Sequence, residues 1–199
     1  MMRYAANILV YLALTIWIGG LVVFGAVVAP ALFGGTLPRT IAGAVNTTIL
    51  NRLGMLEIVA GVVLVGGTLY GAIRVGSWMN WSALVLSIAM LATAAYYTNV
   101  LFPDVNRLRV EIGSFESIPT EKEPLKAQFD RGHRLYSTLA KGVLAAAIAV
   151  LVLQTVSLVR NGARREPQGR TRPERIGATM PAAETTPAVP ERTRPTLSR

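Results

Sequence analysis

The sequence contains no cysteine, a single histidine and few charged residues. The absence of cysteine excludes disulfides, thiolate metal sites and thiol catalysis within this chain. One histidine and scattered methionines cannot supply the three or four ligands of a zinc or copper site, and a bis-histidine haem would need two chains. Charged residues make up 16% of the 199 positions and hydrophobic residues 52%. Little of the chain could therefore face water.

Charge is missing altogether from the stretch Tyr4 to Phe33, which stays uncharged through Pro38. About 20 apolar residues cross a bilayer as a helix, so this stretch predicts a transmembrane helix. A cleaved signal peptide is the alternative, because Arg3 precedes the stretch and small residues surround Ala29 to Ala31. Cleavable signals have an apolar region of only about 7 to 15 residues. We therefore expect the stretch to be retained as a membrane span.

Two further spans follow. Apolar residues at helical spacing lead from the region after Pro38 into the uncharged run Ile58 to Ile73, which predicts one long helix. A third span lies within Val75 to Pro103. Its ends carry Trp78 with Trp81 and Tyr96 with Tyr97, aromatic residues of the kind that favour membrane interfaces.

The last part of the chain predicts an amphipathic helix, a loop and a fourth span. Val105, Leu108 and Ile112 keep a helical rhythm after Pro103, and the polar loop SFESIPTEKE follows. From Pro124 an apolar face continues into the uncharged run Gly142 to Val159. The predicted fold is all-α: an integral membrane bundle of four transmembrane helices, residues 1–160, with helical extensions on one side.

Residues 161–199 form a tail rich in proline and arginine. Nine of the twenty Lys and Arg residues lie at or beyond Arg160, so the net charge of +9 mostly reports this segment. With few large apolar residues the tail is predicted to be disordered, either as a solvated segment that fixes orientation or as a contact for anionic lipid headgroups. No aromatic residue interleaves with the arginines, so we expect no nucleic acid partner. The cluster Arg160 to Arg175 favours both termini in the cytoplasm, in a plasma or inner membrane.

Small residues in the spans allow two interpretations. Gly19 and Gly20 beside Trp17 leave a groove, and Gly67 and Gly71 form a small-xxx-small pair. Both features are typical of close helix packing in lipid, and a groove for a lipid or drug-like ligand is the functional alternative.

Counting depth along the helices brings two layers of polar residues together. The first layer, at one membrane edge, holds Glu57, Tyr97, Asn99 and Lys141. A Glu57–Lys141 ion pair is geometrically allowed there, and independent solvation of both residues is the alternative. The second layer, about 12 Å further out at 1.5 Å per residue, holds Asn46, Thr47, Asn106, Arg107 and His133, with Ser137 one turn from His133.

The second layer is the stronger candidate for a binding site. The fork of donors on Arg107 suits a carboxylate or phosphate, and His133 could carry a proton. A hydrogen-bonded bundle that only holds the helices together is the alternative. A hydrolytic site is not supported, because no third residue or oxyanion donor accompanies Ser137 and His133.

Three stretches carry a family resemblance: TIWIGGLVVFGAVVAPALFGGTLPRTIAGAV, PDVNRLR and FDRGHRLYSTLAKG. Their specific positions include Trp17, Pro30, Asn106, Arg107 and His133. The chain resembles the transmembrane protein 205-like family, a membrane domain of unknown function, and more distantly the copper-resistance membrane proteins. The resemblance covers roughly residues 5 to 160, excludes the tail and implies a four-helix integral membrane protein.

We expect a non-enzymatic protein with a binding or transport-associated role toward lipids or amphipathic small molecules, and with no cofactor. Its expected partners are membrane lipids and a small amphipathic ligand, and a homo-oligomer is compatible with the sequence. A redox or metal-handling membrane component is the alternative, followed by a structural or assembly factor.

Overall fold

The computed structural model describes residues 2–35 and 37–163, which are helical apart from short connecting segments and contain no strand. Its elements in chain order are α1 (Met2–Val23), η1 (Phe24–Val28), α2 (Ala29–Phe33), α3 (Arg39–Val75), α4 (Trp78–Tyr96), η2 (Tyr97–Leu101), α5 (Phe102–Ile112), η3 (Thr120–Lys122) and α6 (Glu123–Ala163). Of these, η1 and η2 are π-helical and η3 is a 3-10 turn.

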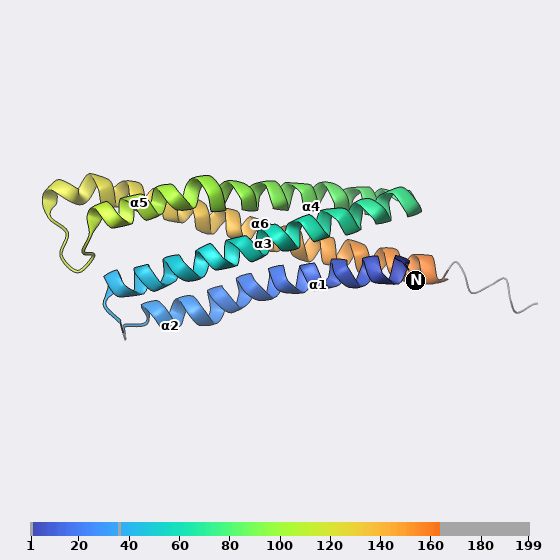
Figure 1. Cartoon of the computed structure of the whole chain (residues 1–199), viewed down its shortest axis with the longest axis horizontal. Helices are drawn as coiled ribbons and strands as arrows, with labels where there is room; N and C mark the ends of the chain where they lie inside the picture. Colours follow the sequence, from blue (N-terminus) through green and yellow to red (C-terminus); the bar gives the residue numbers. More distant parts are fainter. Residues whose placement is uncertain (1, 36, 164–199) are drawn as a thin grey trace, which may run out of the picture.

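These elements form four long rods that lie side by side (Figure 1). The rods are α1–η1–α2, α3, α4–η2–α5 and α6, and each contains a segment long and apolar enough to cross a membrane. The N-terminus, the α3–α4 turn and the end of α6 share one end of the bundle, which we call the terminal end. The opposite end, with residues 34, 35, 37, 38 and 113–122, is the loop end. The predicted all-α bundle of four spans is confirmed.

The predicted helix boundaries agree with the structure in most places. The second span is one helix of 37 residues, and an amphipathic helix continues the third span past Pro103. The fourth helix has 41 residues and runs to Ala163, three residues beyond the predicted end of the bundle at residue 160. Otherwise the tail, and with it the prediction of disorder, lies outside the described residues.

A proline follows each of the two π-helical segments. Pro30 lies two residues after η1, and Pro103 lies two residues after η2. Proline has no N–H, and its ring clashes with the carbonyl four residues earlier, so an α-helix cannot pass through it undisturbed. A wider π turn takes up this disturbance and lets each rod continue to the loop end.

The outer surface of the bundle is apolar, and its small, mainly apolar interior includes polar side chains. Large hydrophobic side chains such as Val59, Val85 and Val152 are exposed, whereas Thr68 and Ser87 are buried and donate hydrogen bonds to carbonyls four residues back. A water-soluble bundle would bury its large apolar residues. The observed distribution fits a bundle surrounded by lipid.

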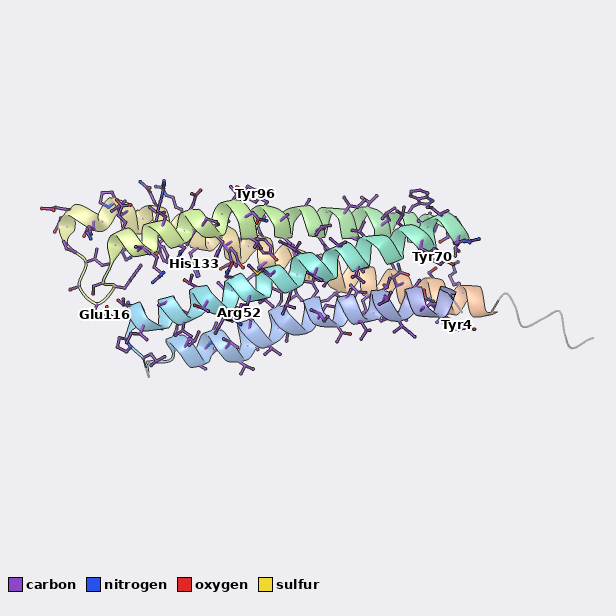
Figure 2. All side chains as sticks on the ribbon, viewed as in Figure 1. Tyr4, Arg52, Tyr70, Tyr96, Glu116 and His133 are labelled. Atoms are coloured by element: carbon purple, nitrogen blue, oxygen red, sulfur yellow. The ribbon has the colours of Figure 1, made fainter. Side chains whose placement is uncertain are left out.

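Polar side chains join three rods at the terminal end. The Asn80 side chain donates to the Gly71 carbonyl at 3.3 Å and accepts from the Ser157 hydroxyl at 2.9 Å. The Ser77 side chain caps α4 by accepting from the Asn80 N–H. Figure 2 shows Tyr4 and Tyr70 near this end of the bundle. These hydrogen bonds connect α3, α4 and α6 near the start of α4. Trp78 and Trp81, the predicted interfacial residues, lie in the same part of α4.

Only one of the two predicted small-residue sites on α3 is a close helix contact. A Cβ added to Gly67 would collide with the Val10 side chain of α1, whereas a Cβ added to Gly71 would meet nothing within 4 Å. On α1 a Cβ at Gly20 would lie 2.8 Å from Leu53, and one at Gly19 would meet nothing. Glycine is therefore required for close packing at Gly67, whereas at Gly20 the flexible end of the Leu53 side chain could move aside.

We expect Gly67→Ala to destabilise the bundle relative to Gly71→Ala, because Val10 is β-branched and cannot move aside without shifting α1. The gain in helix propensity is the same for both changes, so the difference isolates the clash, at about 1 to 3 kcal/mol. Thermal unfolding of both variants in one detergent measures it. Equal midpoints would show that α1 and α3 are not held at this distance.

Candidate functional site: a buried carboxylate beside two adjoining cavities

The side chain of Glu57 lies inside the bundle and is only 1% exposed. One of its oxygens, Oε2, accepts a hydrogen bond from the Tyr97 hydroxyl, which comes from the next rod. The other oxygen, Oε1, is buried without a hydrogen-bond partner. A buried carboxyl group with one unused oxygen inside a membrane bundle is costly, and such residues are functional-site candidates.

Aromatic residues from the other rods surround this carboxyl group. Trp17 of α1 is fully buried, and its indole N–H approaches the Tyr97 hydroxyl without reaching the geometry of a normal hydrogen bond. Tyr136 of α6 packs edge-on against the Tyr97 ring, with centroids 5.0 Å apart. Trp17, Glu57, Tyr97 and Tyr136 thus bring one side chain from each rod together. We call them the carboxylate cluster.

Tyr97, the first residue of η2, continues the buried face of α4 at helical spacing after Met90 and Ala94. Tyr97 is fully buried, whereas its neighbour Tyr96 is 47% exposed (Figure 2). The next residue, Thr98, lies so close to α3 that a Cβ on Gly54 would stand 2.7 Å from its hydroxyl. Gly54 therefore lets η2 approach α3, and Glu57, one turn along α3, meets Tyr97.

A cavity of about 250 Å³ lies on the loop-end side of the cluster. We call it the loop-end cavity. Residues of α2, α3, α5, the loop after α5 and α6 form its walls. The residues that line it are Phe33, Arg39, Thr40, Gly43, Asn46, Thr47, Leu50, Phe102, Val105, Asn106, Arg109, Phe115, Phe129, His133 and Tyr136.

The charged side chains that line the loop-end cavity are both arginines, Arg39 and Arg109. Asn106 orients Arg109 by accepting a hydrogen bond from its Nε at 3.2 Å. Neither arginine forms an ion pair, since Lys126–Asp130 is the single ion pair of the described residues. The cavity wall therefore has a positive charge that no carboxylate of the described chain neutralises by direct contact.

Stacked aromatic rings support the α6 side of this cavity. The His133 ring lies parallel to that of Phe129, with centroids 6.0 Å apart, and Phe129 in turn contacts Phe115 from the loop. This stacking fixes the orientation of the imidazole, whose two nitrogens can donate or accept according to its protonation state.

A second cavity of about 560 Å³ lies between η1–α2 and α6. We call it the lateral groove. Its residues are Leu21, Val22, Phe24, Gly25, Ala26, Ala29, Phe33, Asn46, Leu50, His133, Tyr136, Ser137, Ala140, Lys141 and Leu144. Five of these, Phe33, Asn46, Leu50, His133 and Tyr136, also line the loop-end cavity, so the two spaces adjoin.

Hydrogen bonds across the loop end hold the far side of the loop-end cavity. The Glu116 carboxylate accepts from the Thr40 hydroxyl at 2.5 Å and the Thr40 N–H at 3.1 Å, and from the Ser114 hydroxyl at 2.9 Å. These bonds, led by that from the Thr40 hydroxyl, lower the pKa of Glu116 to about 2. Figure 2 shows Glu116 at the loop end. The ionised carboxylate therefore ties the loop to the start of α3.

The family described as Domain of unknown function (DUF4149) matches residues 12–114, which is more than half of the chain. The chain belongs to this family. The match covers Trp17, Glu57 and Tyr97 of the carboxylate cluster and the α3 and α5 walls of the loop-end cavity, and it ends before α6. No curated protein and no solved structure matches the chain.

The structure brings six of the ten predicted site residues to the cavities: Asn46, Thr47, Asn106, His133, Ser137 and Lys141. Glu57 and Tyr97 meet in the carboxylate cluster. Two of the ten lie apart: Asn99 is exposed and donates to the Ala95 carbonyl of its own rod, and Arg107 is exposed and lines neither cavity.

The ion pair between Glu57 and Lys141 does not form. Glu57 bonds to Tyr97 instead, and Lys141 is exposed along the lateral groove. Equal depth in the membrane placed both residues at one level, but it did not fix the direction in which each side chain points. No group of three His, Cys, Asp or Glu residues within the described ranges could hold a metal ion.

Sequence reasoning did not select Arg39, Arg109, Tyr136 or the stacked Phe115 and Phe129 as site residues. A signal for Arg109 was present: it follows Asn106 by three positions, so the two share a helix face, while Arg107 points about 100° away. Tyr136 was recognised only as part of an apolar face. The loop phenylalanine gave no sequence signal.

We expect Tyr97→Phe to destabilise the protein by about 1 to 3 kcal/mol, because it leaves both oxygens of a buried carboxyl group without a donor. The double variant Glu57→Leu/Tyr97→Phe should cost less than the sum of its two single changes. Thermal unfolding in one detergent measures all three, with Tyr96→Phe as the control on an exposed neighbour. Strictly additive costs would mean that the hydrogen bond contributes nothing.

Proposed function

We propose that this protein is a non-enzymatic membrane protein that binds an amphipathic small molecule, such as a lipid, in a transport-associated role. The observation that carries the proposal is the pair of adjoining cavities, one with basic and amide side chains and the other lined mainly by apolar ones. Ligand pockets of proteins measure roughly 300 to 1,000 Å³. The joined space is of that size.

The position of the lateral groove supports a ligand that comes from the membrane. Counting about 28 Å from Arg160 at 1.5 Å per residue puts Lys141 at the edge of the hydrocarbon layer. The groove extends inward from there to Leu144 on α6 and to Leu21 on the first rod. A ligand could then keep its polar end in the loop-end cavity and its apolar part at the level of the lipid chains.

The alternatives lack an observation of this kind. A redox or metal-handling role predicts a Soret band or a bound metal in the purified protein. Either finding would argue against our proposal. We also propose, as part of this function, that the chain is related to the transmembrane protein 205-like family. The family match itself supports only a membrane domain of unknown function. A structural or assembly role predicts no occupied cavity.

A photoactivatable fatty acid and its matching fatty alcohol test the proposal on the protein in lipid nanodiscs. We expect at least one of them to label residues of η1 and α6, identified by mass spectrometry. Gly25→Leu should abolish that labelling, because Gly25 lines the groove and has open space at its Cβ. Gly19→Leu is the matched control, with equal space outside both cavities.

Ala140→Phe, on the opposite wall, provides a second way to block the groove. Each variant is first compared with the parent protein by thermal unfolding, so that loss of labelling is read only from folded protein. Labelling that spreads evenly over the lipid-facing helices and ignores both blocking variants would contradict the proposal.

We also propose that the protein lies in a plasma or inner membrane with both termini in the cytoplasm. The basic cluster that begins at Arg160 supports this orientation. A reporter fused after Arg199 should be active in the cytoplasm, and one inserted near Ser117 should report the opposite side. Reporters on one and the same side would contradict the four-span topology, and an inverted result would contradict the orientation alone.

A further inference from the structure

The charges that line the joined cavity all have one sign. Arg39 and Arg109 line the loop-end cavity and Lys141 lines the lateral groove, while no Asp or Glu lines either. A basic surface of this kind attracts anions, and its field is strengthened where apolar walls exclude water.

These cations are available to a ligand. Arg109 donates a single hydrogen bond, from its Nε to Asn106, and this bond orients the guanidinium group. The two terminal nitrogens of the group have no partner in the described chain. Arg39 and Lys141 form no ion pair or hydrogen bond in the described chain. Glu116, beside the loop-end cavity, accepts hydrogen bonds from Thr40 and Ser114, and Glu57 accepts one from Tyr97.

Further hydrogen-bonding side chains lie where the two cavities meet. His133 and Asn46 line both spaces. The Oδ1 atom of Asn46 is buried and has no partner in the described structure. Because an amide can exchange its oxygen and nitrogen by rotation, Asn46 offers the ligand either an acceptor or two donors.

We propose that the joined cavity binds an anionic single-chain amphiphile, whose phosphate or carboxylate headgroup lies at Arg39, Arg109 and His133 and whose chain lies in the lateral groove. This inference rests on the proposed function and adds the charge class of the ligand. Phosphate and carboxylate both match the planar fork of arginine. The apolar residues Leu21, Phe24 and Leu144 receive the chain.

A competition experiment in nanodiscs of zwitterionic lipid tests the headgroup. The photoactivatable fatty acid labels the site, and dodecyl phosphate, dodecanoate, dodecylamine, dodecanol and inorganic phosphate are added as competitors. We expect dodecyl phosphate or dodecanoate to compete about tenfold better than dodecanol or dodecylamine, as a charge-assisted hydrogen bond predicts. The ratio of the two anions distinguishes a phospholipid-like source from a fatty acid.

Two arginines of the same helix provide a matched pair of variants. With the uncharged photoactivatable fatty alcohol as the probe, Arg109→Gln should weaken competition by the anionic compounds about tenfold and leave dodecanol unchanged, because only the headgroup contact is lost. Arg107→Gln removes the same charge from an exposed position outside the cavities and should change neither. Equal effects of the two variants would overturn the assignment, since they would reflect net charge alone.

The outcomes separate this inference from the function on which it rests. Equal competition by dodecanol and the anionic compounds, with labelling still blocked by Gly25→Leu, would keep the amphiphile site and overturn its anionic class. Inorganic phosphate competing as well as dodecyl phosphate would also overturn it, because the chain would then add nothing. Absence of groove labelling by any probe would overturn both.

Discussion

The hydrogen bond between Tyr97 and Glu57 is the constraint around which the middle of the bundle is arranged. A buried carboxyl group inside lipid needs a donor, and Tyr97 is the one that contacts it. The bond requires α3 and η2 to approach closely, which Gly54 permits by leaving room for Thr98. Trp17 and Tyr136 approach Tyr97 from the remaining two rods, so that one hydrogen-bonded pair brings all four rods together.

The two π turns explain how straight helices build a site at this level. Each adds a residue to one turn before a proline, which rotates the following segment by about 100° relative to an uninterrupted α-helix. The turn at η2 follows directly on the inward-facing Tyr97, and the turn at η1 contributes Phe24, Gly25 and Ala26 to the lateral groove. Prolines that end a helix in water thus shape a cavity here.

Much of the fold followed from apolar length, because a helix in lipid must satisfy its own backbone and needs about 20 residues to cross. Depth followed from the same counting, and it grouped Asn46, Asn106 and His133 correctly at one end. Depth along a helix does not specify in which direction around the helix axis a side chain points. Glu57 was therefore matched by level to Lys141, although Tyr97, at the same level, is the residue whose side chain faces it.

Tyr136 links the buried carboxylate to the cavities, because it belongs to both. Its ring packs edge-on against Tyr97 and also lines the loop-end cavity and the lateral groove. A ligand in the joined cavity would touch this ring and, through a single side chain, the donor of Glu57. Contact alone gives no coupling, since a ligand shifts an equilibrium only by its differential affinity for two states. The rings of Tyr97 and Tyr136 thus connect the Glu57 carboxyl group to the two cavities, and the packing of Tyr136 on Tyr97 also fixes part of the wall of both.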